Sequence, residues 1–162
     1  MTDIAREAAF HRAALLLGIE PGADVVAWAD NLIVESVEVP KQVLELSTIP
    51  PHDLSELRHS LQPLAAPGDD EALLRALFDR VRLDVARGAR SVKDSVMVLS
   101  QARSFLALPL EYFTNIDTLQ DDHMLAIAGV RGVTAEIEQQ VVLWLAQFEG
   151  SEAEFHSECA RV

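Results

Sequence analysis

The feature that most constrains the fold of this chain is hydrophobic spacing at helical intervals, interrupted by glycine and proline. Apolar residues recur three or four positions apart along most of the sequence, and no segment alternates apolar and polar residues for long enough to form a strand. Six of the seven prolines lie between positions 21 and 67. We therefore predict an all-α, single-domain bundle of about seven to nine helices, with short helices in the first half and longer ones in the second.

Capping signals set the expected helix boundaries. Asp53 with Glu56, and Ser91 with Asp94, have the spacing of an N-cap and the third helical residue. The expected helices cover residues 3–17, 23–36, 40–46, 53–63, the segment from the acidic pair 69–70 to Gly88, the segment from 91 towards Pro109, residues 117–128, the segment from 134 to Gly150, and a short tail from 151. Residues 110–115 are expected to be short or irregular, since Pro109 interrupts the helix before them.

The length of 162 residues predicts one domain, residues 1–162. The stretch 63–70 contains two prolines and one glycine and is the best candidate for a hinge. We interpret it as a loop inside that domain, because the sequence has no linker composition and no fixed-period repeat.

The charge balance limits the classes of partner. There are 26 acidic and 13 basic residues, a net charge of −13, and this argues against nucleic acid or an anionic membrane as a partner. The charge is uneven: residues 1–74 carry −9, residues 75–103 carry +4, and residues 104–162 carry −8. A basic segment therefore separates two acidic ones.

The cysteine content, the lack of a signal-peptide pattern and the lack of catalytic motifs indicate the expected compartment and chemistry. Cys159 is the one cysteine, the first residues do not resemble a signal peptide, and apolar runs such as residues 13–17 are far shorter than a membrane-spanning helix, so we expect a cytoplasmic protein. The common catalytic and cofactor motifs do not occur, and we expect no cofactor, no metal site and no enzymatic activity.

Three histidine or carboxylate pairs were candidates for chemistry. His52 and His59 are seven residues apart, too far along a helix for one metal without a third element, so we interpret them as polar surface. Asp117 and Asp121, followed by Asp122 and His123, could begin a metal or acid–base site, or form an acidic helix start. His156 and Cys159 are three residues apart and could form a reactive thiol or half a zinc site, in a tail where helices fray.

The basic segment contains a candidate anion site. Arg87, Arg90 and Lys93 surround the break between two predicted helices, next to the Ser91 N-cap. The many carboxylates of the chain make internal ion pairing the favoured interpretation of these three residues.

The predicted helix 23–36 has the most informative surface. Asp24, Asn31 and Glu35 share its polar side, and Trp28 lies at the same edge, away from the apolar stripe. A tryptophan among acids is typical of an interface anchor in a charged rim, although it could also pack beneath a neighbouring helix. The predicted partner-binding residues are Glu20, Asp24, Trp28, Glu35 and Glu38, with the acidic tail Glu149, Glu152, Glu154 and Glu158 as a second set.

A resemblance covers about the first 50 residues. The segments Ala14-Leu15-Leu16-Leu17-Gly18, Trp28-Ala29-Asp30, and Pro40 leading to Leu44-Glu45-Leu46-Ser47 resemble a pattern of small acidic all-helical bacterial orphan proteins. Some proteins of that kind are immunity proteins of polymorphic-toxin or contact-dependent secretion systems. The resemblance implies a toxin-binding role and carries over no catalytic residue.

We therefore expect a cytoplasmic interaction protein, an immunity protein or other inhibitor that binds and blocks a basic toxin or effector. Two alternatives stay open. One is a small helical enzyme or ligand-binding protein that uses Asp117, Asp121, His123 or the Arg87–Lys93 cluster. The other is a helical adaptor or subunit that forms a homo-oligomer through an apolar face.

Overall fold

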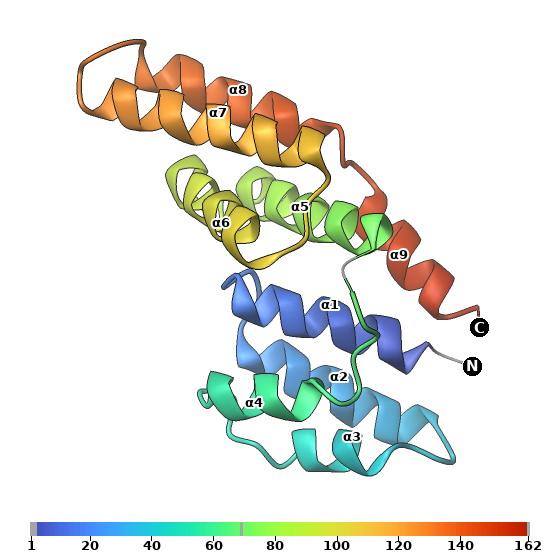
Figure 1. Cartoon of the computed structure of the whole chain (residues 1–162). Helices are drawn as coiled ribbons and strands as arrows, with labels where there is room; N and C mark the ends of the chain where they lie inside the picture. Colours follow the sequence, from blue (N-terminus) through green and yellow to red (C-terminus); the bar gives the residue numbers. More distant parts are fainter. Residues whose placement is uncertain (1–2, 69, 162) are drawn as a thin grey trace. The chain divides into compact units, whose positions relative to one another are not determined.

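The protein is described by a computed structural model that covers residues 3–68 and 70–161; Asp69, which belongs to the predicted hinge, lies outside the described residues. Within these ranges the chain forms nine α-helices and no strand, which confirms the all-α prediction (Figure 1). They are α1 (Ile4–Leu16), α2 (Gly22–Glu35), α3 (Lys41–Leu46), α4 (Leu54–Leu61), α5 (Glu71–Ala86), α6 (Val92–Phe105), α7 (Leu110–Ile127), α8 (Thr134–Ala146) and α9 (Ser151–Cys159). As expected, the short helices α3 and α4 precede the longest ones, α5 and α7.

The chain divides into two compact units. Unit 1 contains Met1–Pro67 and His156–Val162, and unit 2 contains Gly68–Phe155. The boundary between Pro67 and Gly68 lies inside the stretch 63–70 that was the candidate hinge. Helix α9 begins in unit 2 and continues in unit 1. The prediction of one domain over residues 1–162 stays a prediction.

Side-chain caps fix the starts of several helices at the predicted positions. Asp53 accepts a hydrogen bond from the backbone N–H of Glu56 at 3.1 Å, and Ser91 accepts one from Asp94 at 3.0 Å. Asp70 does the same for Leu73 at 2.7 Å. Each cap satisfies a backbone donor that the first turn of a helix leaves without a partner.

Helix α7 corrects one expectation. Residues 110–115 are not irregular but form the first turns of α7, which runs without a break to Ile127. Pro109 stands at the N-cap, where it ends the previous connection and costs the new helix no hydrogen bond. The buried residues Tyr112, Ile116, Leu119 and His123 continue one inward stripe through the segment, and this packing outweighs the weak helix propensity of Tyr112, Phe113, Thr114 and Asn115.

Unit 1 is built around a core shared by α1 to α4. The buried core residues are Ala8, Leu15, Val25, Ala29, Leu32, Val43, Leu46, Leu57 and Leu61. Gly22 begins α2 at a close approach, because a Cβ there would lie 2.0 Å from the carbonyl oxygen of Pro51 and 2.7 Å from a methyl group of Leu57. The absence of a side chain at Gly22 therefore lets α2 pack with its inner face on the core.

Unit 2 is organised by α5 to α8, and Figure 1 shows α7 and α8 side by side. Its core contains an aromatic cluster of Phe78, Tyr112, Trp144 and Phe148, in which Phe78 and Phe148 lie 5.1 Å apart between ring centroids. Trp144 packs inside this cluster, with its ring 5.5 Å from that of Phe78 and 5.0 Å from that of Phe148 between centroids. Across the described residues of both units, none of the helices combines the length and apolarity needed to cross a membrane.

Candidate functional site

The outward side of α2 keeps several of the predicted partner-binding residues exposed. Gly22, Val25, Ala29 and Leu32 are buried, and Val26, Trp28 and Ile33 pack partly against the core, so the other positions of the helix face outward. The exposed residues Asp24, Asp30, Glu35 and Glu38, together with Val34 and Val37, are named here the α2 acidic face. No lysine or arginine occurs between residues 13 and 40, so this segment supplies no cation to neutralise the face.

The α2 acidic face also contains exposed apolar area. Val34 is 85% exposed and Val37 is 104% exposed. Asp24, Asp30, Val34 and Glu35 lie on α2, whereas Val37 and Glu38 follow the end of the helix at Glu35. The next cation along the chain, Lys41, is paired with Glu45 at 3.0 Å.

Glu20 does not belong to that face. Its carboxylate is buried, with 2% of the side chain exposed, and receives hydrogen bonds from Nδ1 of His11 at 2.8 and 3.1 Å. His11 lies on α1 and Glu20 in the connection between α1 and α2, and the hydrogen bonds between them satisfy two polar side chains removed from water. Glu20 is therefore a structural partner of His11 and presents no carboxylate to the surface.

Trp28 packs inside unit 1 rather than standing out as an interface anchor. Its ring lies 4.7 Å from the ring of His11 between centroids, and it packs against the core of unit 1. The side chain is half-buried rather than prominent on the surface. Of the first predicted set, Asp24, Glu35 and Glu38 remain as exposed carboxylates.

The acidic tail residues have mixed environments. Glu149 and Glu154 are exposed. Glu152 is paired with Arg80 at 3.1 Å, and its backbone N–H donates to the buried carboxylate of Asp79 at 3.1 Å. Glu158 is paired with Arg6 at 3.3 Å and belongs to unit 1, whereas the other three belong to unit 2. The four residues therefore do not form one described surface.

The basic segment is largely neutralised within unit 2. Arg90 lies 3.6 Å from Asp84, and Arg82 lies 2.6 Å from the buried Asp79. Arg87 and Lys93 are exposed. Internal pairing of Arg90 agrees with the favoured interpretation, and the three predicted anion-binding residues are not gathered around one point by any described contact.

The Asp117–His123 segment is likewise divided between separate partners. Asp117 forms an ion pair with Arg103, and Asp122 forms one with Arg131. His123 is buried, and its Nε2 lies 3.7 Å from Oε1 of Glu138. Among residues 3–68 and 70–161, no group of three or more histidine, cysteine, aspartate or glutamate side chains is arranged to hold a metal ion.

The tail pair His156 and Cys159 shares a carboxylate that the sequence did not indicate. Glu7 on α1 accepts from Nδ1 of His156 at 2.9 Å, and it also accepts from the thiol of Cys159. Burial of Cys159, and then the negative charge of Glu7, raise the pKa of the thiol from 9.0 to about 12. Since a reactive cysteine needs a lowered pKa, Cys159 is a protonated core residue.

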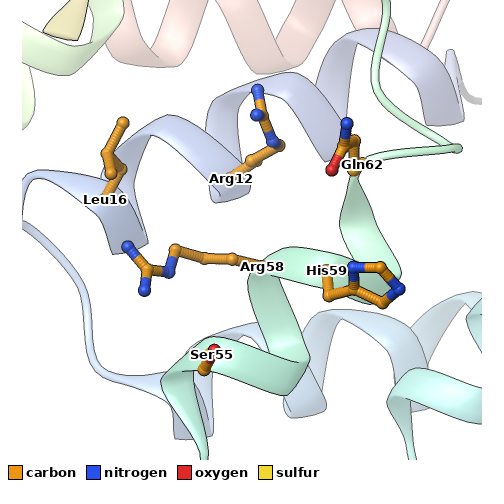
Figure 2. Close-up of a pocket in the computed structure, with 6 residues that line it drawn as sticks. All are labelled: Arg12, Leu16, Ser55, Arg58, His59 and Gln62. Carbon is orange, nitrogen blue, oxygen red and sulfur yellow. The ribbon is translucent and has the colours of Figure 1, made fainter.

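A shallow basic groove lies between α1 and α4 in unit 1. Figure 2 shows the side chains that surround it, which are Arg12, Leu16, Ser55, Arg58, His59 and Gln62, around a volume of about 270 Å³. The guanidinium groups of Arg12 and Arg58 point in different directions (Figure 2), and Nε of Arg58 donates to the carbonyl oxygen of Leu54 at 3.2 Å. The groove therefore does not direct two cations at one anion. His59 lies in its rim and is exposed, as is His52.

No protein-family model matches the chain, and neither a curated protein sequence nor a solved structure matches it.

Proposed function

We propose that this chain is a partner-binding protein, an inhibitor of the immunity type, that uses the α2 acidic face to bind a basic protein surface. The observation that carries the proposal is that the exposed carboxylates of Asp24, Asp30, Glu35 and Glu38 share one short segment with the exposed Val34 and Val37. The segment contributes no basic side chain to weaken its field. A face of one sign attracts a basic partner at long range and raises the association rate.

The inhibitory mechanism follows from the chemistry of the face. Carboxylates on a helix can occupy the positions where phosphate groups would contact lysines and arginines of a nucleic-acid-binding active site. Val34 and Val37 would be removed from water in the complex, and their burial supplies affinity that does not depend on salt. The resemblance of the first 50 or so residues to small acidic helical orphan proteins, some of which are immunity proteins, supports the same role.

The test is a variant in which Asp30, Glu35 and Glu38 are changed to Asn, Gln and Gln. The wild-type chain, immobilised, is used to isolate a basic partner from the source cells, and a carbodiimide crosslink is then mapped by mass spectrometry. We expect crosslinks that join these carboxylates to partner lysines. We also expect a Kd that rises by roughly tenfold or more for the variant, because each lost charge contact at a rim contributes modestly and three are removed.

The matched control changes three exposed acids of unit 2, Glu111, Asp121 and Glu136, to their amides, so that the net charge changes equally. This control variant is expected to retain the wild-type Kd at physiological salt. If both variants lose binding equally, the loss comes from net charge and not from the α2 acidic face, which would contradict the proposal. Crosslinks confined to unit 2 would also overturn it.

A further inference from the structure

The proposed function leaves the basic groove between α1 and α4 of unit 1 unused, and it is named here the α1–α4 groove. Its lining residues lie about one turn apart on each helix: Arg12 and Leu16 on α1, and Ser55, Arg58 and His59 on α4, with Gln62 at the C-cap of α4. Its volume of about 270 Å³ lies just below the roughly 300–1,000 Å³ of pockets that enclose a small molecule. This shallow groove therefore suits a chain segment laid across it better than an enclosed ligand.

Hydrogen-bond donors dominate the lining of the α1–α4 groove. A guanidinium group only donates, and imidazole, amide and hydroxyl groups each have a proton to donate. All the lining residues except Leu16 carry one of these groups, and none of them is an aspartate or glutamate. The neighbouring groove between α3 and α4 shares His59 and Gln62 but is lined by Glu45 and Glu56 as well. The α1–α4 groove is thus the one of the two that suits a ligand rich in hydrogen-bond acceptors.

The two arginines of this groove have no carboxylate partner within the described part of the chain. The chain has 26 acidic and 13 basic residues, and the arginines that form ion pairs include Arg6, Arg80, Arg82, Arg90, Arg103 and Arg131. Among residues 3–68 and 70–161, neither Arg12 nor Arg58 forms such a pair, and Nε of Arg58 donates only to the carbonyl oxygen of Leu54. Arg12 and the two Nη groups of Arg58 are therefore available to carboxylates of another molecule, which are the acceptors that bind guanidinium groups most strongly.

The basic side chains are spread along the groove rather than gathered at one point. Figure 2 shows the guanidinium group of Arg58 extending towards the Leu16 side, His59 lying on the Gln62 side, and Arg12 on the facing helix α1. A compact anion is bound best by donors that converge on it, whereas spread donors fit carboxylates at separate positions of one segment. In an extended segment, residues two apart project from the same side about 7 Å from each other. Acidic residues at alternate positions therefore present two carboxylates to the groove at once.

We infer that the α1–α4 groove binds an acidic, extended segment of another protein, with one carboxylate at Arg12 and a second at Arg58. His59 and Gln62 donate further hydrogen bonds, and the half-buried Leu16 contacts an apolar stem. Nucleic acid suits the groove less well, because unit 1 has 11 acidic and five basic residues and repels a polyanion more strongly than a segment with two charges. The α1–α4 groove shares no residue with the α2 acidic face, so failure of one proposal does not decide the other.

The test titrates a short peptide, acetyl-Ala-Glu-Ala-Glu-Ala-amide, into the full-length ¹⁵N-labelled protein. We expect saturable shifts of the amide signals around Arg12 and of residues 58–62, with the signals of α5 to α8 unchanged. The same peptide with glutamine in place of glutamate is expected to bind roughly tenfold more weakly, because its contacts with the guanidinium groups lose the charge. The inference is overturned if the acidic peptide gives no saturable shift, if the shifts lie in other helices, or if both peptides bind equally. It is also overturned if inorganic phosphate or a ten-nucleotide oligodeoxythymidine shifts the same signals and binds as tightly as the peptide, since the groove would then take another kind of anion.

Two matched variants test the arginines themselves. Arg12→Gln combined with Arg58→Gln is expected to raise the Kd of the acidic peptide roughly tenfold, because both charged contacts are lost. Arg87→Gln combined with Lys93→Gln removes two exposed positive charges of unit 2 and is expected to change that Kd by less than about twofold. Equal losses in the two variants would mean that the peptide responds to net charge alone, which overturns the inference. The comparison of the two peptides on the wild-type chain needs no variant and stands whether or not the variants fold.

Discussion

At the scale of single residues, the histidines show what hydrophobic spacing leaves out. His11 and His156 each bind a glutamate, Glu20 and Glu7 respectively, and Phe10 packs against both imidazole rings at 5.7 and 4.9 Å. The one available signal was that His11 lies on the apolar side of its helix with Ala8 and Leu15, where a buried histidine requires a polar partner. Which glutamate supplies it depends on chain reversals that helical periodicity does not encode.

Cys159 gives a prediction that depends on pH. Its thiol pKa is raised to about 12, so the folded chain retains the proton under conditions in which an unfolded chain loses it. We expect the thiol to react slowly with Ellman's reagent near pH 8 and quickly in urea. The same shift predicts that the free energy of unfolding falls as the pH rises from 9.0 towards 12, and that it falls less in Cys159→Ala. Fast, complete labelling of the native chain would contradict this assignment.

At the scale of helices, sequence patterns located most of the elements and their starts. Caps at Asp53 and Ser91 are local hydrogen bonds between residues three apart, so a short sequence window contains all the information. The first turns of α7 were not predicted, because their helix is stabilised by packing with α6 and α8 rather than by the residues themselves. The same distinction applies to the predicted partner-binding residues. The helical periodicity of α2 predicts which of its acids face outward, whereas the burial of Glu20 depends on its tertiary contact with His11.

The cap of α5 allows a prediction at this scale. Asp70→Ala removes the carboxylate that accepts from Leu73 at 2.7 Å, and we expect it to lower the free energy of unfolding by about 1 kcal/mol. Asp70→Asn retains an acceptor oxygen of the same reach and is expected to lose only a few tenths of that amount. Urea denaturation followed by circular dichroism measures both. An equal loss in the two variants would show that the charge of Asp70, not its cap, stabilises the helix.

At the scale of the whole molecule, the acid excess is shared by two units. Unit 1 has 11 acidic and five basic residues, and unit 2 has 15 and eight, so neither unit alone accounts for the net charge of −13. The two units differ in how their basic side chains are paired with carboxylates. In unit 2 Arg80, Arg82, Arg90 and Arg103 have carboxylate partners within the unit. In unit 1 the exposed acids Asp24, Asp30, Glu35 and Glu38 fall in the segment between residues 13 and 40, which contains no lysine or arginine. The distribution of charge, rather than its total, thus distinguishes a candidate binding face from a soluble surface.

The chain passes from unit 1 through unit 2 and back, and this predicts cooperative unfolding. Helix α9 is continuous from Ser151 to Cys159 across the boundary at Phe155, so loss of unit 1 removes the packing of its second half. Each unit contains one tryptophan, and the variants Trp28→Phe and Trp144→Phe therefore report on the units separately. We expect the two fluorescence transitions in urea to have the same midpoint.

A substitution in the core of unit 1 tests whether the two units unfold together. Leu57 is fully buried, and Leu57→Ala is expected to lower the free energy of unfolding by about 2–5 kcal/mol. If the chain folds as one cooperative domain, the midpoint reported by Trp144 in unit 2 moves together with that reported by Trp28. A shift seen by Trp28 alone would mean that the units unfold independently, and that the boundary at Pro67 and Gly68 separates two domains rather than two parts of one. Coincident shifts would instead show that α9 couples the two cores.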